Sequence, residues 1–118
     1  NSLSGSIPEY IGIVAVTDLD LSGNYFRGTV PTSMGNLTSL RSLHLERNNI
    51  TGEVPNELCT VLSNVTEFGP FKGYVFTADC SGARSVPDLK CLCCTQCYDT
   101  FSLETEVGDC KDIHIEVK

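Results

Sequence analysis

The sequence predicts an α/β fold in which short coils of chain stack into a right-handed solenoid and share one parallel sheet. Three observations predict it. A phrase of Asn, an apolar residue, Gly, an apolar residue and Pro occurs three times, starting at Asn1, Asn24 and Asn48. The copies are offset by 23 and then 24 residues, a period typical of solenoids. All seven cysteines follow the third copy, which predicts a separate cap at that end.

The strand of each coil is predicted from a leucine pattern that precedes the second and third phrases. Leu19 and Leu21 alternate with polar residues, and Leu43 and Leu45 do the same one repeat later. Alternation at period two is typical of a strand with one buried face. We therefore expect these leucines to point into the coil, where each coil buries apolar surface against the next.

The rest of each phrase is expected to form the turn and the convex side. Asn24 and Asn48 stand where the chain leaves the strand, and a buried Asn there can bind backbone groups that the turn leaves unpaired. Gly28 and Gly52 permit the dihedrals of a return turn. The proline that follows each Gly disfavours a regular strand or helix interior. The convex side is therefore predicted to be short 3-10 or irregular structure.

The stretch from Val16 to Leu58 resembles the plant-type leucine-rich repeat, LxxLxxLxLxxNxLxGxIPxxLG, which occurs in receptor-kinase ectodomains and secreted wall proteins. Its departures are mild: valine at three Leu or Ile positions, Phe26 for Leu, and one residue missing between Gly12 and Val16. The resemblance implies a leucine-rich-repeat solenoid over residues 1–58, with the first repeat truncated. Since a solenoid needs about three stacked units, we expect upstream repeats of the same protein to precede Asn1.

Residues 59–118 are expected to form a cysteine-rich C-terminal cap of the same domain. Its cysteines are Cys59, Cys80, Cys91, Cys93, Cys94, Cys97 and Cys110. This density indicates disulfides formed in an oxidising compartment. The pairing is open and one cysteine is left over, although the adjacent Cys93 and Cys94 should have different partners. A zinc site is the alternative, but Cys94-x-x-Cys97 lacks a second spaced pair, so we expect no metal and no cofactor.

The cap has a resemblance of its own. Glu57-Leu-Cys59, Thr77-Ala-Asp79-Cys80 and the run from Cys91 to Cys97 resemble the C-terminal cap of extracellular leucine-rich-repeat proteins in diatoms and related algae. Tyr98 stands where the second of two paired cysteines usually lies, and Cys110 is the candidate to supply that sulfur. The resemblance implies a secreted or cell-surface protein of an algal lineage.

The second half of the chain also predicts individual elements. Asn56 is expected to cap a short helix over residues 57–63, and Gly69-Pro70 marks a turn. Alternation from Tyr74 to Cys80 predicts the last strand of the parallel sheet. The acidic tail over residues 101–118 ends in a strand pattern, which we interpret as an edge strand on the cap; the alternative is an edge that recruits a partner strand.

The net charge and the Asn-x-Thr sequons limit the possible cellular location and the possible partners of the protein. The net charge is −7, so nucleic acid and anionic membranes are poor partners. No apolar run approaches the roughly 18 residues of a membrane span. Asn36, Asn49 and Asn64 begin Asn-x-Thr sequons and are candidate glycosylation sites of a secreted protein, although Asn49 should be hemmed in beside Asn48. Together these features predict an extracellular protein.

The solvent face of the predicted sheet is the concave face, and it supplies the candidate binding residues. By register its rows are Asp18, Ser42 and Val75; Asp20, His44 and Thr77; and Ser22, Glu46 and Asp79. Asp20 beside His44 could form a charge-assisted pair. A Ser–His–Asp hydrolase is rejected, because Ser42 and His44 share one strand with no elbow motif or oxyanion hole. Four carboxylates could hold Ca²⁺, but no loop of regularly spaced ligands is present.

The sequence therefore predicts a non-enzymatic interaction module for adhesion or reception. A protein, peptide or polysaccharide would bind the acidic concave face. One alternative is an inhibitor of a secreted wall-degrading enzyme, since the plant-type repeats include such inhibitors. A weaker one is a structural protein of the wall or matrix, or one that binds mineral or ice, which would need a more regular array of Thr or Asp.

Overall fold

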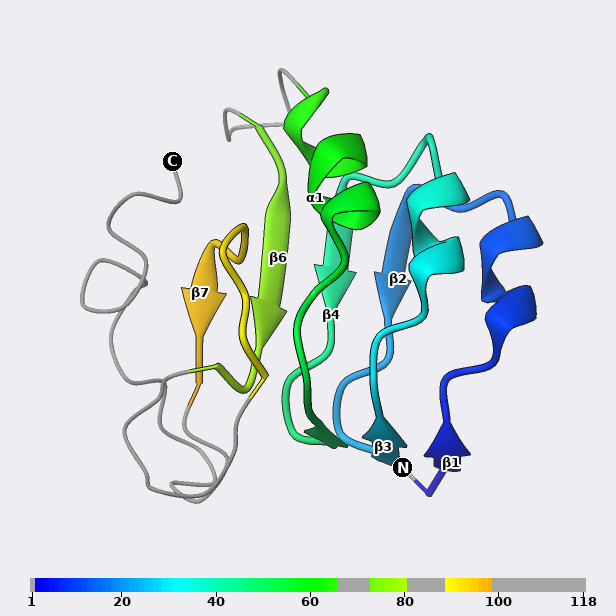
Figure 1. The fold of residues 1–118 in the computed structure, drawn as a ribbon, viewed down its shortest axis with the longest axis vertical. Coiled ribbons are helices and arrows are strands. Elements are labelled where there is room, and N and C mark those ends of the chain that lie inside the picture. Colours follow the sequence, from blue (N-terminus) through cyan, green and yellow to red (C-terminus); the bar gives the residue numbers. More distant parts are fainter. Residues whose placement is uncertain (1, 66–72, 81–88, 99–118) are drawn as a thin grey trace.

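The computed structural model describes residues 2–65, 73–80 and 89–98 of the chain. Its elements are β1 (Ser4–Ser6), η1 (Glu9–Ile13), β2 (Asp18–Asp20), β3 (Tyr25–Gly28), η2 (Thr32–Asn36), β4 (Ser42–His44), β5 (Asn49–Ile50), α1 (Asn56–Ser63), β6 (Val75–Ala78) and β7 (Gln96–Cys97). The strands of one sheet run side by side, and η1, η2 and α1 follow one another along the stack (Figure 1). The chain forms the expected solenoid of stacked coils.

The larger sheet has the order β2-β4-β6-β7, and all its strands are parallel. Leu19, Leu43 and Phe76 are in register across three strands and point into the core, as the alternation predicts. The prediction that β6 would be the last strand is wrong, because β7 adds one more. Thr95 directs this addition: its N–H donates to the Phe76 carbonyl at 2.7 Å, and its hydroxyl accepts from the Phe76 N–H at 2.9 Å.

A second sheet, of order β1-β3-β5, was not predicted. It is built from the Asn-x-apolar-x-Gly phrase, for which the sequence suggested only a return turn. Phe26 and Ile50 are its inward residues, at 7% and 5% exposure. These strands are too short to show alternation. β3 and β5 each place one large apolar side chain in the core, whereas β1 has Gly5 in register with Phe26. The Glu53–Lys90 bridge continues the parallel pairing into the cap, where the Val54 N–H donates to the Lys90 carbonyl at 2.9 Å.

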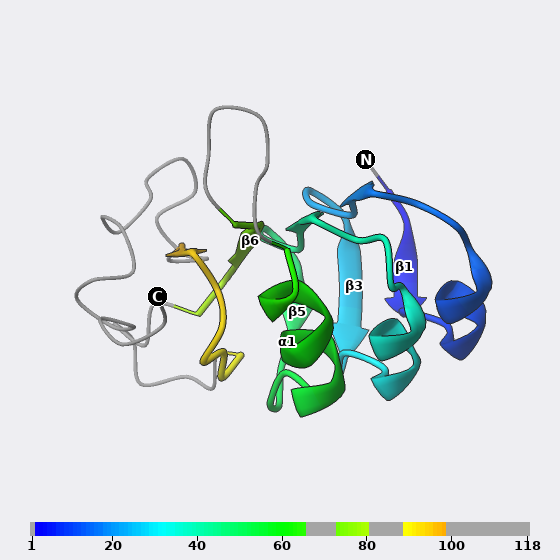
Figure 2. The same ribbon diagram turned by 90° about the horizontal axis from the view of Figure 1, so that it is seen from above.

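Three helical segments cover the convex side, as expected. Viewed from above, η1, η2 and α1 lie in one row (Figure 2). The coils approach closely at Gly12 and Gly35, where an added Cβ would lie 2.4 Å from the Ser33 carbonyl oxygen and from the Glu57 Cβ. The α1 helix is confirmed, but Asn56 is its first residue and Pro55 its N-cap, with no capping side chain.

The asparagine ladder is confirmed. Asn48 accepts the Phe26 N–H at 3.0 Å and donates to the carbonyls of Leu21 and Leu45 at 2.9 and 3.0 Å. Asn24 accepts the Leu3 N–H at 3.1 Å in the coil before. Each Asn therefore pairs buried backbone groups of its own coil and of the preceding one.

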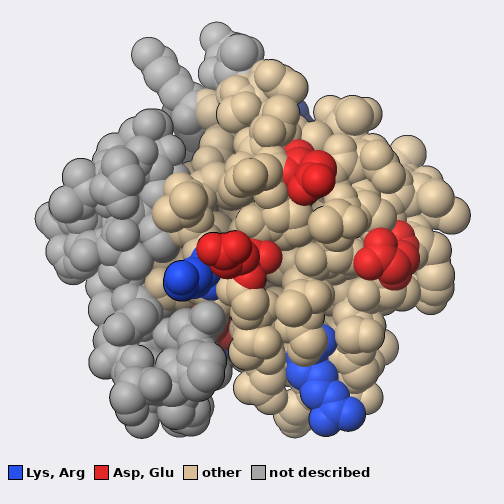
Figure 3. Space-filling view, viewed as in Figure 1, with Lys and Arg blue, Asp and Glu red and all other residues tan. Residues whose placement is uncertain are grey.

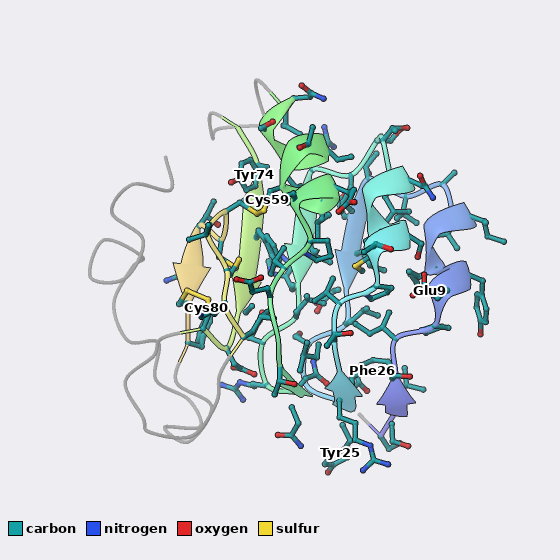
Figure 4. All side chains as sticks on the ribbon, in the orientation of Figure 1. Glu9, Tyr25, Phe26, Cys59, Tyr74 and Cys80 are labelled. Atoms are coloured by element: carbon teal, nitrogen blue, oxygen red, sulfur yellow. A yellow bond between two sulfur atoms is a disulfide. The ribbon has the colours of Figure 1, made fainter. Side chains whose placement is uncertain are left out.

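Within the described residues, three disulfides tie the cap together: Cys59–Cys93, Cys80–Cys97 and Cys91–Cys94. Cys93 and Cys94 have different partners, as predicted. The Cys59 bridge joins α1 to the cap, and the buried cysteines of the cap extend the apolar core together with Leu89. Cys59 and Cys80 are labelled in Figure 4. Cys110, the Gly69-Pro70 turn and the tail over residues 101–118 lie outside the described residues.

Candidate functional site

The register of the larger sheet brings together two of the three predicted rows. Asp18, Ser42 and Val75 are aligned, and so are Asp20, His44 and Thr77. Gln96 of β7 extends the second row and was missed, because a two-residue strand carries no sequence pattern. Asp18 and Asp20 are exposed, whereas Ser22, His44 and Glu46 are half-buried.

Hydrogen bonds link these side chains across the sheet. His44 Nε2 lies 3.2 Å from the Ser42 hydroxyl, and His44 Nδ1 lies 2.8 Å from the Thr77 hydroxyl. The Thr77 hydroxyl also donates to Glu46 Oε1. Both ring nitrogens of His44 are thus engaged, which fixes its ring and places the Glu46 carboxylate beside it.

Three of the expected solvent-facing residues are buried, which corrects the prediction. Ser42, Thr77 and Asp79 have exposures of 6%, 4% and 6%. Thr77 lies between His44 and Gln96 in register, so neighbouring strands cover it from both sides. The register alone predicts on which face of the sheet a side chain lies. It does not predict how far the side chains of neighbouring strands bury it.

Asp79 has a structural role in the turn before β5. Its two carboxylate oxygens accept the N–H groups of Arg47 and Asn48, both at 3.0 Å. Arg47 has a φ of 64°, the left-handed region that Gly23 occupies one repeat earlier with a φ of 69°. Asp79 therefore holds an unusual turn in place and pairs backbone groups of the preceding coil, as the asparagines of the ladder do.

Asp20 pairs with Ser22 in preference to His44. One Asp20 oxygen accepts both the N–H and the hydroxyl of Ser22, at 3.0 and 2.5 Å. The hydroxyl is the main reason why the pKa of Asp20 lies below its ordinary value of 3.8; partial burial opposes this shift, and the Ser22 N–H and the charge of His44 add to it. Since Asp20 binds Ser22 and His44 Nδ1 meets Thr77, these residues do not form a Ser–His–Asp triad.

Neither metal alternative gains support from the described residues. Of the four carboxylates considered for Ca²⁺, Asp79 is buried and both of its oxygens accept backbone N–H groups. In the described part of the chain, the group with the spacing of metal ligands is Cys80, Cys94 and Cys97. Their sulfurs are in disulfides and are not the thiolates that zinc requires.

The sequon asparagines are all exposed. Asn36 ends η2, Asn49 lies in β5 and Asn64 follows α1. The expectation that Asn49 would be hemmed in is wrong, because its side chain points away from the core while Asn48 points inward.

The first coil leaves an open apolar face. Leu3 is 57% exposed, whereas Phe26, its counterpart one repeat later, is 7% exposed. Leu19 and Leu21 are half-buried, whereas the equivalent Leu43 and Leu45 are buried. The middle coil is covered on both sides and the first on one side only, which accounts for the difference.

Comparison with known proteins gives matches over the same coils. A family model for the Leucine Rich Repeat matches residues 15–37 and 39–61. Receptor-like protein 53 of Arabidopsis thaliana is 49% identical over 67 residues, 55% of this chain and 7% of that protein. Pollen receptor-like kinase 2 of the same plant is 39% identical over 59 residues, 49% of this chain and 9% of the kinase.

A solved structure also matches. It is the LRR ectodomain of the plant membrane receptor kinase GASSHO1/SCHENGEN3 from Arabidopsis thaliana, in complex with CASPARIAN STRIP INTEGRITY FACTOR 2. The TM-score is 0.50 and the identity 38%, over 52% of this chain and 8% of that one. The chain thus covers less than a tenth of the length of each of these relatives.

Proposed function

Since the chain belongs to the plant-type leucine-rich-repeat proteins, we propose that it is a non-catalytic extracellular module that binds a protein or peptide on the outer face of its larger sheet. The observation that carries this proposal is an acidic strip, formed by Asp18, Asp20 and Glu46. Asp18 and Asp20 are exposed on β2, and Glu46 is half-buried just beyond β4. Hydrogen bonds already fix Asp20 and Glu46, so little ordering would be needed on binding.

The chemistry of the acidic strip favours a basic ligand. Carboxylates that face solvent on a parallel sheet can accept charge-assisted hydrogen bonds from Lys or Arg side chains. Strands about 4.8 Å apart would let one extended peptide reach carboxylates on neighbouring strands. By contrast, the face seen in Figure 3 carries few charged side chains, and these are scattered. A basic peptide or protein segment therefore fits the acidic strip better than the helical side.

The relatives support a macromolecular ligand and an extracellular location. The matched solved structure is an ectodomain in complex with a named factor. Three disulfides in the described part of the chain are typical of an oxidising compartment. Among the described residues, no helix has the length and hydrophobicity to cross a membrane.

The open face of the first coil supports a further partner, namely upstream repeats of the same protein. Both β1 and β2 are edge strands, and the apolar side chains beside them are the ones that a neighbouring coil buries elsewhere in the stack. In this account residues 1–58 are the end of a longer array and residues 59–118 are its cap. The algal lineage remains a prediction, as the matches reported above are to plant proteins.

Adhesion, enzyme inhibition and a structural role remain alternatives within the same architecture. A polysaccharide is also compatible with an exposed, polar strip. Binding of a basic peptide would favour reception over a structural role, and inhibition of secreted glycosidases by the purified chain would favour the inhibitor.

The test uses immobilised 12-residue peptides in which two Lys residues are fixed and the rest varied, with Glu in place of Lys as the control library. The Asp18→Asn/Asp20→Asn/Glu46→Gln variant removes three charges and keeps the side-chain shapes. We expect Lys peptides selected on the wild-type chain to lose at least tenfold in affinity on this variant. Equal affinity for both chains at an unchanged melting temperature would reject the acidic strip as the site.

The conservative variant is chosen for a structural reason. His44 and Glu46 are the hydrogen-bonding partners of the buried Thr77 hydroxyl. Truncating both would leave that hydroxyl unpaired and mix a folding effect with a binding effect. The Arg41→Gln variant, changed just before β4, serves as the matched control for an altered charge near the sheet.

A further inference from the structure

The outer side of the second sheet has a composition unlike that of the acidic strip. Its outward residues are Ser4 and Ser6 of β1, Tyr25 and Arg27 of β3, and Asn49 of β5, here called the Tyr25 face. Ser4 is in register with Tyr25, and Ser6, Arg27 and Asn49 form one row. All five residues are exposed, while the intervening Phe26 points into the core.

The exposure of Tyr25 is not caused by the open apolar face of the first coil. Six large apolar side chains are strongly exposed in the described residues, and four of them belong to the first coil: Leu3, Tyr10, Ile13 and Val14. Leu92 lies in the cap. Tyr25 is 60% exposed although β3 is the central strand of its sheet, paired on both sides. In Figure 4 it lies at the lower edge of the molecule, at β3.

Charge is distributed differently on the two sheets. The described residues of β1, β3 and β5 include no carboxylate, whereas β2 and the turn after β4 carry Asp18, Asp20 and Glu46. The Arg27 side chain is exposed and has no carboxylate partner within the described part of the chain. Arg47 is exposed in the turn that leads into β5. In a chain of net charge −7, this sheet is a local basic surface.

From this juxtaposition of an exposed aromatic ring, an exposed guanidinium and small polar side chains, we infer that the Tyr25 face binds an acidic oligosaccharide that contains uronate. The apolar face of a sugar ring packs on an aromatic side chain, and Tyr25 offers its ring without needing to move. Arg27 can bind a uronate carboxylate through two parallel hydrogen bonds. Ser6 and Asn49, on either side of Arg27, supply donors and acceptors for sugar hydroxyls.

An acidic peptide is the competing occupant, and the same surface favours it less. An acidic peptide would bind Arg27 and Arg47 through its carboxylates. It has no row of hydroxyl groups that could pair with the side chains of Ser6 and Asn49. This inference does not depend on the acidic strip, because the two surfaces lie on different sheets and share no residue.

The test is a titration of the full chain, produced without N-glycans because the candidate acceptor Asn49 lies on this face. The probe is a hexamer of α-1,4-linked galacturonate, and its fully methyl-esterified form is the uncharged control. We expect saturable binding of the acid and at least tenfold weaker binding of the ester. Tyr25→Ala and Arg27→Ala should each weaken binding of the acid at least tenfold, whereas Tyr25→Phe should retain it.

The outcomes separate the occupants and guard against loss of fold. All three variants change exposed side chains, so their melting temperatures should match that of the wild type, and Arg41→Ala should bind like the wild type. Unchanged binding in both Tyr25→Ala and Arg27→Ala would overturn the site. Binding of a glutamate hexapeptide as tight as that of the uronate, independent of Tyr25, would replace the sugar by an acidic peptide and overturn the inference.

Discussion

The repeat coils and the cap reach the same architecture by different means. In residues 2–55, recurring leucines and asparagines set the register, and each coil repeats the contacts of the one before. In residues 73–98 the leucine pattern is absent, yet β6 and β7 continue the parallel sheet. Phe76, Ala78 and buried half-cystines replace the leucines, and Asp79 replaces the asparagine. A parallel stack can therefore be extended by any side chains that fill its core and pair its backbone.

The difference also predicts where stability comes from. A coil without cysteines depends on apolar burial, which is roughly proportional to the area removed from water. A short cap with few large apolar residues depends more on cross-links that restrict the unfolded chain. Substitutions in the two regions should therefore have distinct signatures.

The largest effect is expected at Leu43, which is fully buried between the coils. Leu43→Ala should lower the free energy of unfolding by about 3–5 kcal/mol, because it removes transfer energy and leaves a cavity. Leu19→Ala, the equivalent change in the first coil, should cost clearly less, since Leu19 is only half-buried. Urea denaturation of both variants measures the difference, and equal losses would contradict the contrast between a covered and an open coil.

Removing single disulfides should show how much the stability of the cap depends on cross-links. Cys59 and Cys93 are 34 residues apart, so removing their bridge should cost about 4 kcal/mol on the loop-closure model. Cys91 and Cys94 are 3 residues apart, and the same model gives about 1.6 kcal/mol. Thermal denaturation of the two double-alanine variants tests this order. The reverse order would show that packing, and not chain restriction, governs the cap.

The replacement of Asn by Asp at the end of the ladder can be tested at Asp79. Asp79→Ala leaves the N–H groups of Arg47 and Asn48 without their acceptor, and the buried Asn48 group should cost about 1–3 kcal/mol. Asp79→Asn keeps one acceptor oxygen and should lose less. Hydrogen exchange of the two amides is the direct readout; protection that survives in Asp79→Ala would exclude the proposed role.

The smallest effect concerns the acidic strip. Ser22→Ala removes the hydroxyl that chiefly lowers the pKa of Asp20, so this pKa should rise toward 3.8. A lowered pKa stabilises the folded state above the unfolded pKa of about 3.9 and loses this contribution as the pH falls through the folded value. At neutral pH the variant should therefore be slightly less stable than the wild type, and its stability should fall slightly less when the pH is lowered through this range. Carboxyl NMR titration checks the shift, and an unchanged pKa would mean that His44 or solvation sets it.

Much of the repeat half could be predicted from the sequence because its signals recur. The strands at Leu19 and Leu43, the ladder of Asn24 and Asn48, and the α1 helix all follow from local patterns. The second sheet could not be predicted, since β3 and β5 each bury only one large apolar side chain, β1 buries none, and no strand shows alternation. Strand β7 was missed for a related reason: it has two residues, and the hydroxyl and N–H of Thr95 align it.

The candidate site was predictable in register but not in burial. Repeat spacing aligned Asp18 with Ser42 and Asp20 with His44. It could not show that Ser42 and Thr77 would be covered by neighbouring strands, or that Asp79 would turn toward the Arg47 loop. These outcomes depend on the strands on either side, and β7 was not among those expected.

Ligand binding at the acidic strip can be tested by an NMR titration of the isotopically labelled chain with a selected two-Lys peptide and with its Glu counterpart. We expect saturable shifts of the Asp18, Asp20, His44 and Glu46 signals with the Lys peptide, no shifts with the Glu peptide, and none for Tyr25 or Arg27. Shifts confined to the helical segments or to the Tyr25 face, or equal responses to both peptides, would contradict the assignment of the acidic strip as the ligand site.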